Sequence, residues 1–392
     1  LRWSVHLILI KLNSFTFNFS FFMKLFLIKI VVFIIPIIVT LSPGIFMFKS
    51  SGEYYTSIDT IIKKEEDFII GYEFSQQNYK YLKWKTLVVQ NKKEIWSVGS
   101  SRILQFRKEM FNASFYNAGL VVERISDFLH FFKSIPKEKY PNIVLINIDQ
   151  FNFNQEWYGK PIGLQEDYFK GSFNFLPSFS SFKNLYNNIL RGKYNNSYID
   201  SLKRVGLQAL YYNSGIREDG SMSYGYQIDN LLNDNPRAFD YRFLDTYNRL
   251  KTGTNRFEYG SNLNSSSIED LRILLKFFHD NNIQVVAFLP PFPNEIATFM
   301  NQNGKHEYIN KIAPLIKEYF KQYNFEFWDF TDGETIKTND NEFLDGFHGS
   351  DMVYLKMLRY LSNNESQMKK YIDNKKITNY INSPINRFCA FK

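Results

Sequence analysis

The sequence predicts an α/β fold built on a doubly wound parallel sheet, with an insertion and a single transmembrane helix before it. Three observations support this. Short apolar runs alternate with segments of helical apolar spacing, over 94–148 and again over 267–361. Runs such as 142–148 are apolar almost throughout, as in a strand buried on both faces. Finally, residues 30–48 form an apolar run long enough to cross a bilayer once.

The elements follow in order along the chain. The first group comprises strands at 94–99, 114–117 and 142–148, with helices at 102–111 and 121–135 between them. The second group comprises helices at 267–280, 308–323 and 351–361, with strands at 284–289 and 325–330. This alternation is typical of βαβ units and a parallel sheet.

Polar or turn-forming residues follow several of these strands directly. Ser101, Gly119, Asp149, the Pro-Pro pair at 290–291 and the segment 345–348 all have such positions. Because parallel sheets of this class bind ligands at the carboxyl ends of their strands, we expect these residues to gather at one edge.

The apolar run near the N-terminus predicts a membrane anchor at 23–48. Lys24 and Lys29 lie just before the apolar run at 30–48. The positive-inside rule therefore places the N-terminus in the cytoplasm and the remainder outside. A cleaved signal peptide is the alternative, but the run is long and no small-x-small cleavage site follows it. No cysteine lies near the run, which argues against a lipoprotein. Residues 1–22 are another apolar, aromatic-rich stretch that we interpret as an over-extended translation start.

The rest of the chain divides by composition into three parts. Residues 49–90 are expected to be a juxtamembrane segment, and 91–365 the α/β domain, with an insertion at about 152–262. Within the insertion, the pattern over 215–226 predicts either a polar hairpin that shapes a substrate cleft or a solvated surface loop. The polar, basic tail at 366–392 is expected to be a solvated end.

Composition excludes several functions. A single cysteine, Cys389, rules out an intramolecular disulfide and a cysteine-rich metal site. The net charge of +8 is spread along the chain without a basic patch typical of nucleic-acid binding. There is no Walker loop and no Gly-x-Gly-x-x-Gly motif, so we expect no cofactor and no metal.

Two short motifs indicate a nucleophile and its base. The Gly-Ser-Ser-Arg segment at 99–102 places Ser101 on a strand-to-helix turn, and the Asp-x-x-His segment pairs Asp345 with His348. Taken alone, the first motif is typical of a helix N-cap, and the second of an exposed histidine near an acid. Of the five histidines, however, His348 is the one with an acid at short fixed spacing and a glycine on either side. Together they predict a Ser-His-Asp arrangement.

The order and spacing of these motifs resemble the SGNH (GDSL-like) hydrolase superfamily. Its first block, Gly-Asp-Ser, is similar to 99–101, and its last block, Asp-x-x-His, matches Asp345 and His348. The resemblance covers roughly 90–150 and 265–362. It implies a flavodoxin-like three-layer sandwich with Ser101 as nucleophile, and Gly119 as the glycine whose N–H enters the oxyanion hole.

The third block departs from the family pattern. That block normally reads Gly-x-Asn-Asp and its asparagine donates to the oxyanion, whereas this chain has Asn-Ile-Asp-Gln at 147–150. The resemblance leaves two alternatives. Either Gln150 donates in place of the asparagine, or Asp149 fills the position and the oxyanion hole lacks a donor, which typically costs ~100- to 1000-fold in rate.

Within the superfamily, the chain is most similar to the membrane-anchored proteins of lipoteichoic acid D-alanylation and alginate O-acetylation. The resemblance implies an extracytoplasmic serine esterase or O-acyltransferase that acts on acyl esters of cell-surface polysaccharide, beside a membrane-bound O-acyltransferase. The altered third block favours an alternative of another class, a non-catalytic SGNH-fold protein that binds glycan or serves as a scaffold for such a partner.

Overall fold

Five parallel strands form the central sheet, in the order β3-β2-β4-β8-β9. Their bounds are β2 (Ile95–Gly99), β3 (Phe115–Gly119), β4 (Ile143–Asn147), β8 (Gln284–Leu289) and β9 (Glu326–Asp329). Numbered along the chain, the order is 2-1-3-4-5, which is the doubly wound order found in flavodoxin. The predicted α/β class and parallel sheet are therefore confirmed, and every predicted strand of the sheet is present.

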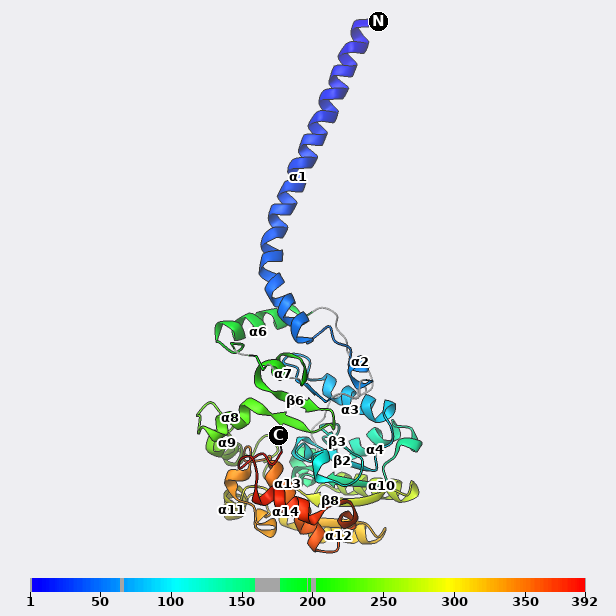
Figure 1. Cartoon of the computed structure of the whole chain (residues 1–392), viewed down its shortest axis with the longest axis vertical. Helices are drawn as coiled ribbons and strands as arrows, with labels where there is room; N and C mark the ends of the chain where they lie inside the picture. Colours follow the sequence, from blue (N-terminus) through cyan, green and yellow to red (C-terminus); the bar gives the residue numbers. More distant parts are fainter. Residues whose placement is uncertain (1, 64–66, 159–176, 196, 199–201, 392) are drawn as a thin grey trace.

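The computed structural model describes residues 2–63, 67–158, 177–195, 197–198 and 202–391, and for 2–22 the helical backbone alone. In Figure 1 the long helix α1 (Arg2–Ser51) leads into a body that contains both sheets. Among the described residues one helical segment, Met23–Ser51, is long and apolar enough to cross a membrane.

Helices cover both faces of the central sheet. Trp96 of β2 is in register with Val144, and Val144 with Val285, so Phe288 three residues further on points to the opposite face. On the first face Trp96 stacks on Phe132, with 5.6 Å between ring centroids. That phenylalanine belongs to α4 (Ile125–Lys133), which packs against α10 (Ser265–Asp280).

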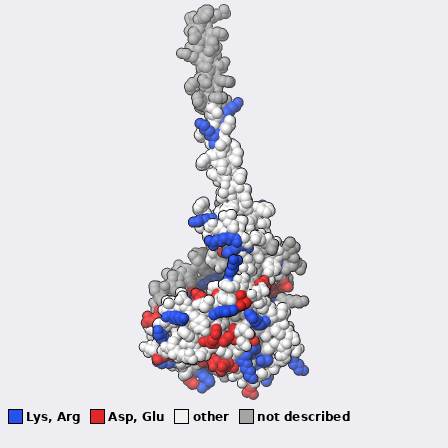
Figure 2. All heavy atoms as spheres, turned by 90° about the vertical axis from the view of Figure 1, so that its left-hand side faces the viewer, with Lys and Arg blue, Asp and Glu red and all other residues white. Residues whose placement is uncertain are grey.

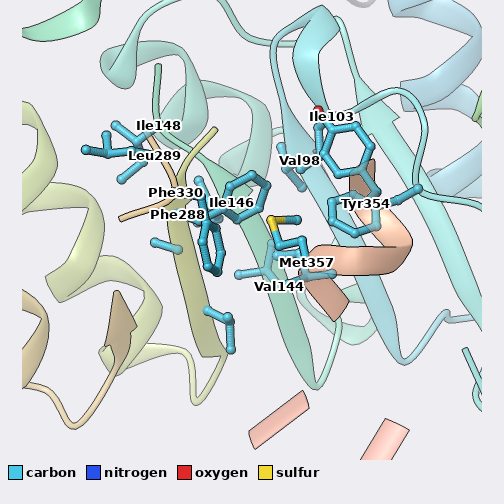
Figure 3. Close-up of a cluster of buried hydrophobic side chains, with 14 of the residues drawn as sticks. Val98, Ile103, Val144, Ile146, Ile148, Phe288, Leu289, Phe330, Tyr354 and Met357 are labelled. Atoms are coloured by element: carbon cyan, nitrogen blue, oxygen red, sulfur yellow. The ribbon is translucent and has the colours of Figure 1, made fainter. Parts of the chain in front are cut away.

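On the second face, the ring centroids of Phe288 and Phe106 are 6.1 Å apart. The centroid of Phe106 is 4.7 Å from that of Tyr354, which belongs to α13 (Asp351–Asn363). Figure 3 shows core side chains from β2, β4, β8 and α13 meeting in one cluster. Fully burying one such side chain contributes about 1.5–3 kcal/mol, so this core holds the strand ends in place.

The predicted helix at 102–111 is wrong. The segment forms two short 3₁₀ turns, η1 (Ser101–Ile103) and η2 (Lys108–Met110). The reason is tertiary: the Asn117 side-chain amide donates to the carbonyl oxygens of Ile103 and Phe106, both at 2.9 Å, which an α-helix would use internally.

A second sheet joins the juxtamembrane segment to the insertion, in the order β5-β1-β6-β7. β1 (Phe68–Ile70) pairs in parallel with β5 (Lys203–Val205) and antiparallel with β6 (Ser214–Arg217), which forms a hairpin with β7 (Met222–Tyr224). The hairpin predicted over 215–226 is present, and its predicted role in shaping a substrate cleft stays a prediction. Residues 49–90 are thus part of the folded body, which also holds α2 (Ile58–Ile62) and α3 (Asn78–Val89).

The C-terminal tail is not a solvated end. It forms η8 (Gln367–Tyr371) and α14 (Asn374–Asn382), which pack on α13, and Met368 and Ile377 are buried. Its few apolar side chains account for this packing, although basic and polar residues dominate the composition. The remaining elements are α5 (Gln155–Tyr158), α6 (Phe179–Leu190), α7 (Leu207–Tyr212), α8 (Gly225–Leu232), α9 (Leu244–Thr252), α11 (Asn294–Asn303), α12 (Tyr308–Lys321), η3 (Lys137–Lys139), η4 (Gln150–Phe153), η5 (Tyr241–Phe243), η6 (Gly333–Ile336) and η7 (Asp340–Glu342).

Candidate active site

Ser101 follows β2 at a turn held by a side chain from the next strand of the sheet. β2 ends at Gly99, and the backbone N–H of Ser100 donates to Asn147 Oδ1 at 3.0 Å. A Cβ at position 99 would lie 1.5 Å from that same oxygen. The glycine is therefore required by the close approach of Asn147, and this contact fixes the backbone immediately before Ser101.

The Ser101 hydroxyl lies 2.8 Å from His348 Nε2. The two residues are 247 positions apart in the chain. His348 keeps about a fifth of its side chain exposed, at 21%. A partly exposed hydroxyl within hydrogen-bond reach of an imidazole is the arrangement that nucleophilic catalysis requires.

Asp345 holds the other side of the imidazole. His348 Nδ1 lies 2.8 Å from Asp345 Oδ2 and 3.0 Å from Oδ1, and Oδ1 also accepts the backbone N–H groups of Phe347 and His348. Burial by itself raises the pKa of Asp345. The charge of His348 and these hydrogen bonds outweigh burial, so the pKa lies below its ordinary value and the group stays ionised.

The loop that carries Asp345 and His348 is anchored to the insertion. The N–H of Gly346 donates to Asp240 Oδ2 at 2.9 Å, and a Cβ at 346 would lie 2.5 Å from Thr246 Oγ1. The insertion, whose role the sequence did not reveal, thus contacts the loop that carries His348, the general base of the proposed triad.

The structure brings the three predicted residues of the triad together, and it places the three predicted oxyanion residues differently from expectation. Gly119 ends β3, and its N–H donates to Asn117 Oδ1 at 2.8 Å, so this donor is already in use. The next residue, Leu120, adopts a left-handed φ of 70° and donates its N–H to Ser100 O. Strain of this kind, of order 1–3 kcal/mol, is characteristic of functional loops.

Gln150 and Asp149 bind a buried arginine instead of facing Ser101. Gln150 Nε2 donates to Pro290 O at 2.8 Å and to Thr331 Oγ1 at 3.0 Å, and its Oε1 accepts from Arg102 at 2.8 Å. Asp149 Oδ1 accepts from Arg102 at 3.4 Å. The expectation that Gln150 replaces the family's asparagine as oxyanion donor is therefore wrong in this structure, because both of its amide hydrogens have other acceptors.

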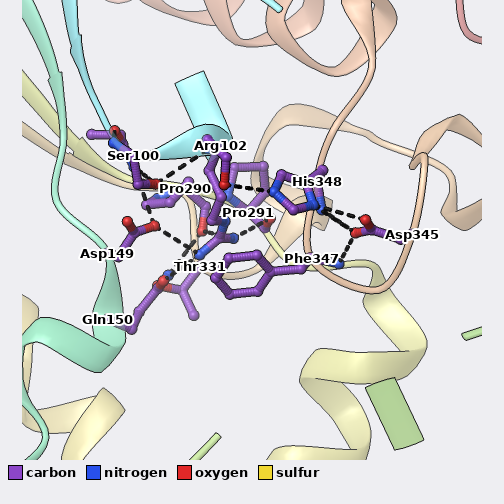
Figure 4. Close-up of polar contacts among 12 residues, drawn as sticks. Ser100, Arg102, Asp149, Gln150, Pro290, Pro291, Thr331, Asp345, Phe347 and His348 are labelled. Carbon is purple, nitrogen blue, oxygen red and sulfur yellow. Dashed lines mark hydrogen bonds and ion pairs between the residues drawn. The ribbon is translucent and has the colours of Figure 1, made fainter. Parts of the chain in front are cut away.

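Arg102 is the residue that the sequence interpretation missed. Its side chain is 1% exposed, and one guanidinium nitrogen donates to Pro290 O at 3.1 Å and Pro291 O at 2.7 Å. The guanidinium also contacts the rings of Phe292 and Phe347, 4.4 and 4.3 Å from their centroids. Arg102 thus contacts three loops, which carry Gln150, Pro291 and Phe347 (Figure 4). The available signal was its place in the motif, directly after Ser101 and before an apolar residue.

One oxyanion donor remains at the nucleophile itself. Among the described residues, none accepts a hydrogen bond from the Ser101 backbone N–H. In the same part of the chain, no group of three or more His, Cys, Asp or Glu side chains is placed to hold a metal ion. The arrangement supports acyl transfer through a serine nucleophile, with Ser101 N–H as one donor to the developing oxyanion.

Comparison with known proteins adds no family to this geometry. Neither a scan of the chain against protein-family models nor a search of curated proteins finds a match.

Proposed function

We propose that this protein is an SGNH-type serine esterase or O-acyltransferase that acts on acyl esters of cell-surface polysaccharide. The observation that carries the proposal is the continuous set of short contacts from Ser101 Oγ through His348 to Asp345, at 2.8 Å in each step. The 2-1-3-4-5 strand order, with the three residues after strand ends, supports the SGNH likeness of the sequence.

The chemistry follows from the geometry. Ser101 Oγ attacks the ester carbonyl carbon while His348 Nε2 takes its proton, and ionised Asp345 stabilises the imidazolium that forms. The imidazolium then protonates the leaving alcohol oxygen as the carbon–oxygen bond breaks, which leaves an acyl group on Ser101. Water, or a sugar hydroxyl in a transferase, attacks this acyl-enzyme after His348 removes its proton, and restores the serine.

Membrane attachment supports the proposed setting. A candidate span at Met23–Ser51 precedes the body, and Lys24 and Lys29 lie near its N-terminal end. By the positive-inside rule this arrangement favours a catalytic body on the extracytoplasmic side. An anchored enzyme meets surface polysaccharide as it emerges, which favours acylation during export and work beside a membrane-bound O-acyltransferase.

One observation favours the second candidate, a non-catalytic protein that binds glycan or serves as a scaffold for such a partner. The Gly119 N–H and the Gln150 side chain, two of the three predicted oxyanion residues, are both committed to internal hydrogen bonds. A site with Ser101 N–H as its single donor loses roughly 100- to 1000-fold in rate for each missing partner.

The deciding experiment uses the full chain in detergent with a fluorophosphonate probe and p-nitrophenyl acetate. We expect covalent labelling and ester turnover in the native chain and in Ser266→Ala, whose serine is exposed on α10. Both should vanish in Ser101→Ala. Absence of labelling in a native chain that still melts cooperatively would favour the second candidate. Labelling that survives Ser101→Ala would place the nucleophile elsewhere.

A further inference from the structure

Helix α6 (Phe179–Leu190) is joined to the candidate membrane span by specific contacts. In Figure 1 it lies across the end of α1 that enters the body. The Gly44 N–H donates to the Tyr186 hydroxyl oxygen at 3.2 Å, and that hydroxyl donates in turn to Thr40 O. Tyr186 is thus inserted between the two groups that an α-helix would join directly.

Close packing reinforces this joint. A Cβ at Gly44 would lie 2.9 Å from the ring of Phe182, so the glycine admits α6 to the surface of α1. The same ring lies 5.4 Å from that of Phe48, and the Tyr54 hydroxyl is 2.8 Å from Ser181 Oγ. These contacts fix α6 at the level of residues 40–48 of α1.

The free side of α6 carries large apolar side chains. Phe179 is 83% exposed and Leu190 is 85% exposed. They are eleven positions apart, close to three turns at 3.6 residues per turn, so they lie on one face. This face adjoins the stripe of Phe182 and Tyr186 that contacts α1. It also carries exposed Lys183, four residues after Phe179, whereas Asn184 lies on the far edge. Exposing two such side chains to water forgoes the free energy gained when apolar surface is buried.

The apolar face of α6 continues the apolar surface of α1. Along the candidate span, Val39 is 64% exposed and Phe46 is 71% exposed, at the same level as the contacts with α6. We propose that α6 is an interfacial membrane helix, whose Phe179–Leu190 face lies in the lipid bilayer where α1 leaves it. Amphipathic helices of this kind sit about 5–10 Å into the boundary between headgroups and acyl chains.

Charge around this surface matches a lipid headgroup layer. Lys49 at the end of α1, and Lys183, Arg191 and Lys193 on or just after α6, are exposed. Figure 2 shows basic side chains gathered where α1 meets the body. Long basic side chains beside an apolar face extend to lipid phosphates and are attracted to an anionic membrane surface.

Hydrogen bonds join the end of α1 to the body, so contact of α6 with the membrane would also affect how the body is held. Gly206 N–H donates to Ser51 O at 2.6 Å, and Glu53 accepts the N–H groups of Phe74 at 2.9 Å and Leu207 at 3.0 Å. The end of α1 and the residues just after it are therefore hydrogen-bonded to the body. Attachment through α1 and α6 together sets the tilt of the body, and with it the height of the Ser101 site above the bilayer. The inference rests on α1 as a span, independently of the chemistry at Ser101.

Site-directed spin labelling of the full chain tests the proposal. In a Cys389→Ser background, single cysteines replace Phe179, Leu190, Asn184 and, as the reference within the span, Val39. The chain is reconstituted as single copies in lipid nanodiscs, and the label's accessibility to oxygen and to an aqueous nickel chelate is measured. We expect oxygen to dominate at 39, 179 and 190, and the chelate to dominate at 184.

Each other outcome overturns the proposal. Chelate-dominated labels at 179 and 190, matching that at 184, would place the α6 face in water. Labels at these two positions shielded from both reagents would mean that protein covers the face. A chelate-dominated label at 39 would remove the span on which the inference rests. A melting curve for each variant confirms that the fold is retained. None of these outcomes depends on ester turnover, so the proposed function is judged separately.

Discussion

Replacing Arg102 with methionine should destabilise the fold more than any exposed arginine change. The native guanidinium donates to Asp149, Gln150, Pro290 and Pro291. Methionine fills similar space beside the rings of Phe292 and Phe347, so the perturbation is mainly the loss of charge and of donors.

The hydrogen bonds give the magnitude. After the change, Pro290 O keeps the donor Gln150 Nε2 at 2.8 Å, and Asp149 Oδ1 keeps Asn147 Nδ2 at 3.1 Å. Gln150 Oε1 and Pro291 O lose the Arg102 donor, at about 1–3 kcal/mol for each buried acceptor left unsatisfied. Asp149 also becomes a buried charge without its cation, and breaking such a pair typically costs about 3–5 kcal/mol. Because these terms overlap, we expect a total near 3–5 kcal/mol.

Urea unfolding of the detergent-solubilised chain, followed by tryptophan fluorescence, measures this loss in the free energy of unfolding. Arg272→Met is the matched control, since that arginine pairs with Glu269 at the surface and its side chain is 58% exposed. It should cost less than about 1 kcal/mol. Adding Asp149→Asn to Arg102→Met should restore part of the loss because the uncompensated charge is removed. A cost below about 1 kcal/mol for Arg102→Met, or no recovery in the double variant, would refute this reasoning.

Three further predictions concern the triad, a buried lysine and a glycine. Asp345→Asn should lower ester turnover about 10⁴-fold, as the same change does in a serine protease triad, because His348 loses its orienting carboxylate. Burial lowers the pKa of Lys83 to about 7, with partial opposition from Asp219. The unfolded chain then holds a proton that the folded chain has released, so stability should rise by about 2 kcal/mol from pH 7 to 9. Gly99→Ala should displace the Asn147 side chain and lower both turnover and melting temperature.

Each of these predictions has its own control. For the triad, Ser266→Ala should leave turnover unchanged, and an Asp345→Asn chain with native turnover would contradict the proposed role. For the lysine, the difference in unfolding free energy between the native chain and Lys83→Met should change across this pH range. A constant difference would mean that other groups cause the pH dependence of the free energy of unfolding. For the glycine, an Ala substitution at Gly304, where a Cβ meets open space but φ is +62°, separates backbone strain from the clash.

Most of the central sheet could be predicted from the sequence because its strands other than the edge strand β9 are buried on both faces. β8 has the predicted bounds, Gln284–Leu289, since a run apolar throughout fits a strand between two helical layers. In the second sheet only the β6–β7 hairpin was predicted. The pairing of β1 with β5 was not, because β1 is three residues long and β5 lies more than a hundred residues away. Propensity carries little information for such short strands, and long-range pairing decides them.

The same division applies to the site. Ser101, Asp345 and His348 belong to two local motifs, so their roles could be predicted before their contact was seen. The partner of the Gly119 N–H is local, since Asn117 lies two residues before it. The partners of Gln150, which are Arg102, Pro290 O and Thr331, are brought close by the fold, so no spacing along the chain reveals them. The lost helix at 102–111 has the same origin, since the side chain of Asn117 takes carbonyl oxygens that the helix would need.

Whether Gly119 can still serve the oxyanion is a question of competing free energies. Its N–H must leave Asn117 Oδ1, a bond of 2.8 Å, and a buried oxygen left unsatisfied costs about 1–3 kcal/mol. An oxyanion-hole donor in a water-excluded site contributes about 2.7–4 kcal/mol to the transition state. Within the proposed mechanism, the gain exceeds the cost over most of these ranges, and only when negative charge develops on a substrate oxygen. Asn117 would then compete with the oxyanion for the Gly119 N–H and would keep it against a neutral ground-state carbonyl, which is the discrimination that the proposed catalysis requires.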